Sequence, residues 1–587
     1  MKMFKNIRIL FILLGVIVAS SCTDYLDKEP SADLTEENVF TSFRNFQGYV
    51  EVMYGDIINL TASSDGRAVR NIGDDMSPKD AGFGFIDGNY RKIFGAREFW
   101  FWSSLAQRSW RGTRNAIWQN SWWGIRSANI ALANIDMLVE ATDPGNQLLA
   151  EQKRLIEGQA YFFRGYFHME LIRAWGDIPY IDMEFVGGEI PNVPQLGLYN
   201  TIEKVVADLD KAIDLLPVDW DDIATGQLTL NQNIGRATKG TALAVKAQAL
   251  LYAASPLFNG TVTGNYEYNI EYAKESAEAA WQVIKLANEE GVYALEPWET
   301  YSDIFYRWDG TIPKSKEHIL MEVVRGIAAY EWQQFNPSPG EQTTSPTENY
   351  VSRFGMANGL PIDDPDSGFD ENNPWENREP RFYYNHWLDG DRIATTINDD
   401  RAFVRYYEGR TPQVGRTGYG HRKYMDENVN WYDGHIGFWY YRVPHLRFSE
   451  MYLIYAEMAN EAYGPHGVHP GADISAVDAI NIIRNRAGVP NVNAKYTGSI
   501  EVFRERIWDE RAVELAYEAK RWYDIRRWHV GHLPEYKEKY KLEFDADHTY
   551  FKKVLLETTV FEERHYWLPF PDEQIKLYPE WKQNPGW

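Results

Sequence analysis

Hydrophobic positions recur along most of this chain every three or four residues, which is the spacing of one helix face. Between residues 118 and 139 that face is formed by Trp118, Trp122, Ile125, Asn129, Leu132, Ile135 and Val139. Side chains at this spacing face a core, while the positions between them face water. The pattern therefore predicts a long helix, which Pro144-Gly145 closes.

The same spacing predicts further helices, several with recognisable start and stop signals. They cover residues 148–175 with Gly176 as C-cap, 200–216 with Asn200 as N-cap and Pro217 as stop, 238–254, 270–286, 447–463, 474–487 with Asp473 as N-cap, and a long helix from Ser499 toward Trp528. Paired helices joined by short turns are typical of a solenoid of helical hairpins. The full tetratricopeptide consensus is not found, so we expect the repeat to be structural only.

The helical pattern fades between residues 293 and 444. Gly, Pro, Asn, Asp and aromatic residues dominate there, and short strands are predicted at 319–324 and 403–407. Long irregular segments inside a compact protein usually carry function. We therefore predict a mainly α protein with four parts: a leader over 1–21, a helical scaffold with ligand loops over 22–292, a loop-rich ligand-binding region over 293–444, and a C-terminal helical scaffold over 445–587.

The first 21 residues have the features of a bacterial export signal. Three basic residues precede an apolar run over residues 9–18, which is too short to span a bilayer. Ala19-Ser20-Ser21 then leads into Cys22, the one cysteine of the chain. This order predicts cleavage before Cys22 and a lipid such as palmitate on its sulfur. The alternative is an ordinary secretory signal followed by an incidental cysteine.

Charge and residue content narrow the classes of function. The chain has 84 acidic and 60 basic residues and a net charge of −24, so nucleic acid is not an expected partner. One cysteine excludes an internal disulfide and a Cys-rich zinc site. The histidines follow no H-E-x-x-H spacing, and neither a P-loop nor a G-x-S-x-G motif is present. We therefore expect no cofactor and no metal.

Two charged clusters have a functional and a structural interpretation. Glu510, Glu514 and Glu518 recur every four residues with arginines close by, which fits either acid–base catalysis or a structural ion-pair network. We predict the network. The acidic loop over residues 363–370 does not match the EF-hand calcium loop, and we predict a solvated turn.

Aromatic residues make up 15% of the chain, including 22 Trp, and some of them lie outside the predicted helices. Trp100 and Trp102 precede the first long helix, Trp332 lies in the loop-rich region, and Asp75 lies in a Gly- and Pro-containing loop. A flat ring covers the apolar face of a sugar, and a carboxylate accepts hydrogen bonds from hydroxyl groups. We predict that these four residues bind a glycan, with core packing as the alternative for each Trp.

Several segments, in order along the chain, together suggest a known family. They are residues 22–30 (CTDYLDKEP), 157–179 (EGQAYFFRGYFHMELIRAWGDIP), 447–457 (RFSEMYLIYAE), 481–488 (NIIRNRAG), 509–516 (DERAVELA), 520–528 (KRWYDIRRW) and 568–571 (LPFP). These segments resemble the SusD/RagB family of outer-membrane nutrient-binding lipoproteins. No single motif is decisive, but together they span nearly the whole chain after the leader.

The resemblance implies a tetratricopeptide-like helical scaffold with a loop-rich ligand-binding part. It also implies a non-enzymatic lipoprotein anchored at the cell outer membrane and facing outward. Such a protein captures oligosaccharide or polysaccharide and delivers it to a SusC-like TonB-dependent transporter. Three alternatives stay open: a secreted glycoside hydrolase, a transporter lid that binds a non-sugar nutrient such as a peptide, and a purely structural transporter subunit.

Overall fold

The computed structural model describes residues 39–58, 60, 72–78, 85–91, 117–139, 148–185, 192–321, 344–410, 415–425, 429–430, 432–434 and 439–587. Within these ranges the protein is mainly helical, and its strands are short and form two-stranded ladders. Both halves of the predicted fold class are therefore confirmed: a helical scaffold and a part dominated by loops. No helix in the described ranges is long and apolar enough to cross a membrane.

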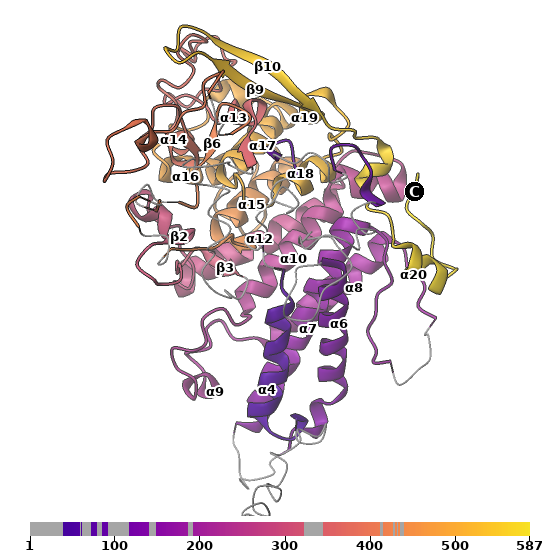
Figure 1. Ribbon diagram of the computed structural model, residues 1–587. Coiled ribbons are helices and arrows are strands. Elements are labelled where there is room, and N and C mark those ends of the chain that lie inside the picture. The colour runs from indigo at the N-terminus through magenta and orange to yellow at the C-terminus, as the bar shows by residue number, and fades with distance from the viewer. Residues whose placement is uncertain are drawn as a thin grey trace, which may run out of the picture.

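The scaffold is a series of long helices packed side by side (Figure 1). Its main members are α4 (Phe43–Glu51), α6 (Ile117–Ala133), α7 (Leu149–Trp175), α8 (Leu198–Leu215), α10 (Lys239–Ala254), α12 (Ile270–Glu290), α15 (Phe448–Tyr463), α16 (Ala476–Arg486) and α17 (Ile500–Glu514). α7 packs between α6 and α8, α10 packs between α8 and α12, and α12 packs against α15. This order is that of consecutive helical hairpins.

Local sequence signals set several helix ends as predicted. Gly176 follows α7 with a φ of +77° and donates its N–H to the Ile172 carbonyl, a conformation that glycine adopts without strain. Thr238 caps α10 through a reciprocal capping box with Thr241. α12 begins after the Asn269 cap and runs four residues past the predicted end.

Three predicted boundaries are wrong. Asn200 lies inside α8, where Gly197 precedes the first turn and the Asn200 side chain donates to the Leu196 carbonyl. Ser475, and not Asp473, caps α16. The long helix after Ser499 ends at Glu514, and the chain turns before α18 (Arg521–Arg527) begins.

That turn has a physical cause. Tyr517 and Ala519 adopt left-handed backbone conformations, with φ values of +64° and +61°. Such conformations are costly for residues other than glycine and persist where surrounding contacts hold them. Here the Glu518 side chain between them accepts hydrogen bonds from Lys423 and Arg447 in the interior.

Where the structure describes the loop-rich middle, its helices and strands are short, and some of its strands pair with strands outside it. They are η4 (Trp298–Ile304), α13 (Glu348–Val351), α14 (Pro380–Asn385), η6 (Asp400–Ala402), and the antiparallel pairs β1 (Met76–Pro78) with β4 (Thr344–Pro346), β2 (Tyr306–Arg307) with β7 (Tyr440–Tyr441), β3 (His318–Leu320) with β8 (Leu446–Arg447), and β5 (His386–Trp387) with β6 (Gly420–His421). The strand predicted at 319–324 overlaps β3 only at residues 319 and 320, and its residues 322–324 lie outside the described ranges. The one predicted at 403–407 is wrong, since Phe403 forms only an isolated bridge to Arg392. The four-part division of the chain stays a prediction.

The C-terminal part adds a feature that the pattern analysis missed. β9 (Glu538–Phe544) and β10 (Phe551–Thr558) form an antiparallel hairpin along one side of the molecule (Figure 1). The remaining short elements are η1 (Val52–Asp56), η3 (Ile135–Met137), α9 (Ala224–Gln227), α11 (Pro256–Thr263), η8 (Ala494–Tyr496), α19 (Pro534–Lys537), η9 (Glu563–Tyr566) and α20 (Asp572–Leu577).

Candidate functional site

The residues predicted to bind ligand or lipid lie mostly outside the described ranges. Cys22, Trp100, Trp102 and Trp332 fall in segments that the structure does not describe. Their roles therefore stay predictions. Among the other Trp residues considered, Trp118 is 4% exposed and packs edge-on against Trp175, as predicted for a core residue.

Asp75 is described, and its side chain is buried. It lies in the turn before β1, is 2% exposed, and its Oδ1 atom has no hydrogen-bond partner among the described residues. Burial, with the charge of Asp74 adding to it, raises the pKa of the Asp75 carboxyl to about 7. β1 pairs with β4, whose first residue, Thr344, comes 12 positions after Trp332 in the chain. The role of Asp75 as a sugar acceptor stays a prediction.

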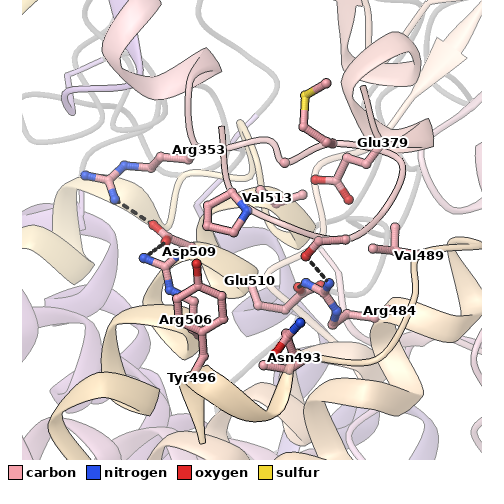
Figure 2. A pocket seen from close by; sticks show the side chains of 15 residues that line it. Arg353, Glu379, Arg484, Val489, Asn493, Tyr496, Arg506, Asp509, Glu510 and Val513 are labelled. Carbon is pink, nitrogen blue, oxygen red and sulfur yellow. Dashed lines mark hydrogen bonds and ion pairs between the residues drawn. The ribbon is translucent and has the colours of Figure 1, made fainter. Parts of the chain in front are cut away.

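A hollow lies between the loop-rich middle and helices α16 and α17 (Figure 2). Its volume is about 480 Å³, which includes open solvent at its mouth. The loop over residues 353–361 forms one wall, and residues from α16, α17 and the connection between them form the other. Sites between two parts of a fold are common places for ligands.

Charged side chains in this hollow are already paired with one another. Arg353 Nη1 and Arg506 Nη2 hold the two carboxylate oxygens of Asp509, at 2.8 and 3.0 Å (Figure 2). Arg484 bridges Glu510 at 3.1 Å and the Gly359 carbonyl at 2.7 Å. The hollow can offer hydrogen bonds to a small polar group, but Asp509 and Glu510 are bound to guanidinium groups and do not form a free acid–base pair.

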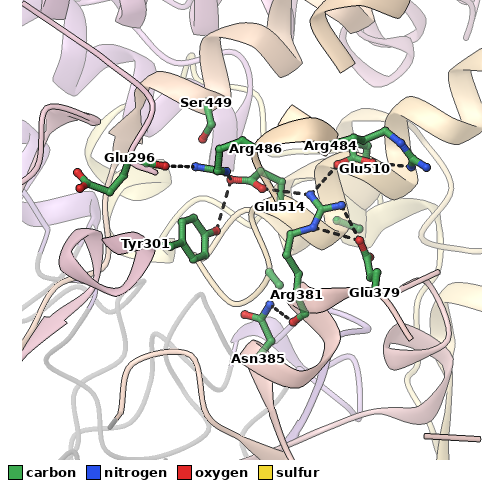
Figure 3. Close-up of polar contacts among 12 residues, drawn as sticks. Glu296, Tyr301, Glu379, Arg381, Asn385, Ser449, Arg484, Arg486, Glu510 and Glu514 are labelled. Carbon is green, nitrogen blue, oxygen red and sulfur yellow. Dashed lines mark hydrogen bonds and ion pairs between the residues drawn. The ribbon is translucent and has the colours of Figure 1, made fainter. Parts of the chain in front are cut away.

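Glu379, Arg484 and Glu510 line the hollow and also belong to a network of buried charges (Figure 3). Arg381 donates to Glu379 at 2.8 Å, to Glu510 at 2.6 Å and to Glu514 at 3.1 Å. Arg447 reaches Glu514 at 2.7 Å, and Arg486 also pairs with Glu514. Nearly all of these side chains are less than 10% exposed, so the network belongs to the interior.

The electrostatics of the network fit a structural role. Burial acts to raise the pKa of the Glu514 carboxyl, but three neighbouring guanidinium groups outweigh it and hold that pKa well below its usual range. A carboxylate held ionised in this way cannot serve as a general acid near neutral pH. The predicted ion-pair network is therefore confirmed. It also includes partners from the loop-rich region, Glu317, Arg381 and Lys423, that spacing on one helix could not reveal.

The acidic loop over residues 363–370 is a solvated turn at Asp363, Asp366 and Asp370, as predicted, but the side chain of Asp364 is buried, which the prediction missed. Asp364 accepts from Lys495 and Tyr496, and Asp370 accepts from Asn372 and Asn373. In the described part of the chain, no three His, Cys, Asp or Glu side chains come together in a way that could hold a metal ion.

Comparisons with known proteins converge on one family. The sequence profile described as "SusD family" matches residues 316–587, and the one described as "Starch-binding associating with outer membrane" matches residues 24–251. SusD-like protein P2 of Formosa agariphila is 24% identical over 539 residues, which cover 90% of this chain and 91% of that protein.

Solved structures show the same fold. A SusD-like protein from Bacteroides fragilis superposes with a TM-score of 0.70 at 23% identity, covering 95% of this chain and all of the other. A second protein from that organism, described as a SusD-like carbohydrate-binding protein, gives a TM-score of 0.64 at 19% identity, covering 93% of this chain and all of the other.

Proposed function

The chain belongs to the SusD/RagB family, and from this membership we propose that it is a cell-surface lipoprotein that binds glycans and passes them to a TonB-dependent transporter of the outer membrane. The observation that carries the proposal is the match of residues 24–251 to a profile described as starch-binding and associating with the outer membrane. The relative described as a carbohydrate-binding protein, with the same fold, supports it.

In this proposal Cys22 carries the lipid anchor and the protein faces outward. One acyl chain holds a protein only marginally at a membrane, whereas two or more hold it stably. The binding surface is made by Trp100, Trp102 and Trp332, with Asp75 accepting hydrogen bonds from sugar hydroxyl groups. A rigid ring loses little side-chain entropy when a sugar docks on it. Burial of roughly 80 Å² against one Trp contributes about 2 kcal/mol, and two or three such contacts give a weak but useful affinity.

The protein acts in this proposal without catalysis. The carboxylates that cluster in the sequence between residues 510 and 518 are engaged by arginine and lysine side chains, which leaves them poorly suited to glycoside hydrolysis. A hydrolase would instead need one carboxyl group that stays protonated and one that stays ionised near the bond to be cut.

The test is isothermal titration of the purified protein with a panel of soluble polysaccharides that includes amylopectin. We expect Trp100→Ala and Trp332→Ala each to weaken binding of the recognised glycan by about 2 kcal/mol, or roughly thirtyfold. Trp308→Ala is the matched control, because Trp308 is 45% exposed and is not assigned to the site. We expect its affinity and melting temperature to equal those of the wild type.

Two results would overturn the proposal. If both Trp variants bind as the wild type does but melt at a lower temperature, these residues belong to the core. If new reducing ends accumulate when the protein is incubated with the polysaccharides, the protein is a hydrolase.

A further inference from the structure

One wall of the hollow between the loop-rich middle and α17 carries more positive than negative charge. Arg353 and Arg506 share a single carboxylate, that of Asp509, whose two oxygens lie 2.8 and 3.0 Å from the two guanidinium groups. Neither arginine pairs with another carboxylate in the described part of the chain. We call these three side chains the Asp509 clamp. Its two cations and one anion leave a net charge of +1 (2 − 1).

The other charges around the hollow are balanced or screened. The buried network contains five cations and five anions, which are Arg381, Lys423, Arg447, Arg484 and Arg486 with Glu317, Glu379, Glu510, Glu514 and Glu518. Asp364 accepts from the Tyr496 hydroxyl but is paired with Lys495 and does not line the hollow. Asp366, the second partner of Lys495, is 79% exposed, so water screens it. In a chain with a net charge of −24, the clamp is therefore a local attractor for anions.

The clamp can be reached from solvent and has donors to spare. The side chains of Arg353, Asp509 and Arg506 are 19%, 21% and 20% exposed, and they face the hollow together (Figure 2). Within the described ranges Asp509 is the sole hydrogen-bond acceptor of Arg353, and Arg353 Nε has none. The Arg506 guanidinium lies over the Tyr496 ring, 5.1 Å from its centroid, which fixes its plane. Two planar guanidinium groups held side by side suit the oxygens of an oxyanion.

The opposite wall is fixed before a ligand arrives. The Met356 N–H donates to the Leu360 carbonyl at 2.9 Å, which closes the loop over residues 353–361. Arg484 Nη2 ties this loop to α16 through the Gly359 carbonyl at 2.7 Å. Little conformational entropy is therefore lost when a ligand enters.

The remaining lining is largely aliphatic, and this indicates what carries the anion. Its apolar members are Met356, Pro361, Val489, Val492 and Val513. The exposed Asn493 also lines the hollow and can bond to hydroxyl groups. The volume of about 480 Å³, with open solvent included, lies in the range of small-molecule sites. A ring with an apolar C–H face, hydroxyl groups at its edge and one oxyanion matches this lining.

We propose that the hollow binds an acidic sugar, a pyranose ring that bears one singly charged oxyanion, either a uronic carboxylate or a sulfate ester. The oxyanion accepts hydrogen bonds from Arg353 and Arg506, and the ring lies on the aliphatic side chains. The site shares no residue with the binding surface of the proposed function. Only the choice of a sugar as the carrier of the anion rests on that function.

The first test compares ligands on the wild type, with dissociation constants measured by saturation-transfer NMR. We expect glucuronic acid or glucose 6-sulfate to bind at least tenfold more tightly than glucose, and the tighter of the two identifies the oxyanion. Glucuronamide is the matched control for glucuronic acid, because it has the same ring and no charge. We expect it to bind within twofold of glucose.

The second test changes the charge of the clamp in both directions. Arg506→Gln removes one cation, and we expect it to weaken binding of the acidic sugar at least tenfold without changing that of glucose. Asp509→Asn removes the carboxylate that competes for the same donors, and we expect it to tighten binding severalfold. Arg405→Gln is the matched control, since Arg405 is 25% exposed and pairs with Asp400 at 3.0 Å away from the hollow. Its affinity for the acidic sugar should stay within twofold of the wild type.

Three outcomes would overturn the inference. If the two acidic sugars and glucuronamide bind the wild type as glucose does, the hollow does not recognise charge, and this result requires no variant to fold. If Arg506→Gln and Asp509→Asn both weaken binding, the clamp supports the fold and does not hold the ligand. If sodium acetate or sodium sulfate displaces the acidic sugar at equal concentration, the hollow takes free anions and not a sugar. The proposed function is tested with polysaccharides and Trp variants, so either proposal can fail while the other stands.

Discussion

Removal of one buried arginine tests whether a buried ion pair between residues far apart in the chain stabilises the fold. Arg521 Nε lies 2.6 Å from Asp74 Oδ1 and its Nη2 lies 2.8 Å from Asp74 Oδ2, with less than 5% of either side chain exposed. Arg521→Ala leaves the Asp74 carboxylate buried without its counter-charge, which costs about 3–5 kcal/mol. The chain has 587 residues, and its entropy of unfolding is roughly 1.2 kcal/mol per kelvin if it unfolds as one unit. The expected fall in melting temperature is therefore about 2.5–4 °C.

Differential scanning calorimetry measures this fall, and Arg401→Ala is the matched control. Arg401 holds Asp399 with the same two-pronged geometry, at 2.9 and 2.6 Å, but the two side chains are 60% and 51% exposed. Water and salt screen such a pair, so its loss should cost at most about 1 kcal/mol, which is less than about 1 °C here. If Arg521→Ala melts like the control, the buried pair does not stabilise the fold as we reason. If it melts normally but binds no glycan, the ligand site lies at Asp74 and Asp75.

Two further predictions concern a carboxyl group and the lipid anchor. The folded pKa of Asp75 is about 7, whereas an unfolded Asp titrates near 3.9, so the wild type loses stability as the pH rises from about 4 to about 7. The melting temperature of Asp75→Asn should therefore rise relative to that of the wild type over this window, and the difference should stay constant at higher pH. A difference that does not change with pH between about 4 and about 7 would show that Asp75 is ionised throughout. Cys22→Ala should move the protein from the membrane to the soluble fraction in cells that lack the transporter, as followed by immunoblotting, and retention in the membrane would refute acylation at this residue.

The pattern of hydrophobic positions predicted most of the scaffold, because long amphipathic helices repeat one signal many times. It failed where short-range signals competed. Asn200 and Asp473 resemble N-caps, yet Gly197 and Ser475 hold those positions, since caps are chosen by the packing of the whole helix as well as by side-chain type. The β9–β10 hairpin could have been predicted from the alternating residues 538–544, which precede a turn that contains Asp545 and Asp547.

The candidate site was less accessible to sequence reasoning. The repeat of Glu510, Glu514 and Glu518 pointed to a charged helix face, but their partners Arg381 and Lys423 lie more than 90 residues away in the chain. No local spacing encodes such contacts, because they exist only after the loop-rich part has packed on α15 and α17. The break after Glu514 was hidden for the same reason: a left-handed Tyr517 is favourable only when its tertiary contacts hold it.

The short segment around β1 forms contacts with residues close to the C-terminus. Asp74 binds Arg521, the Met76 carbonyl accepts from Lys539 at 2.7 Å, and Ser77 donates to Glu557 at 3.0 Å. Each contact joins residues more than 440 positions apart. Contacts between such distant residues slow folding, because a long loop must close before they form. During synthesis the segment around β1 therefore lacks Lys539 and Glu557 until β9 and β10 have been made, so a chain that stops before β9 can form the Asp74–Arg521 pair but not the other two contacts.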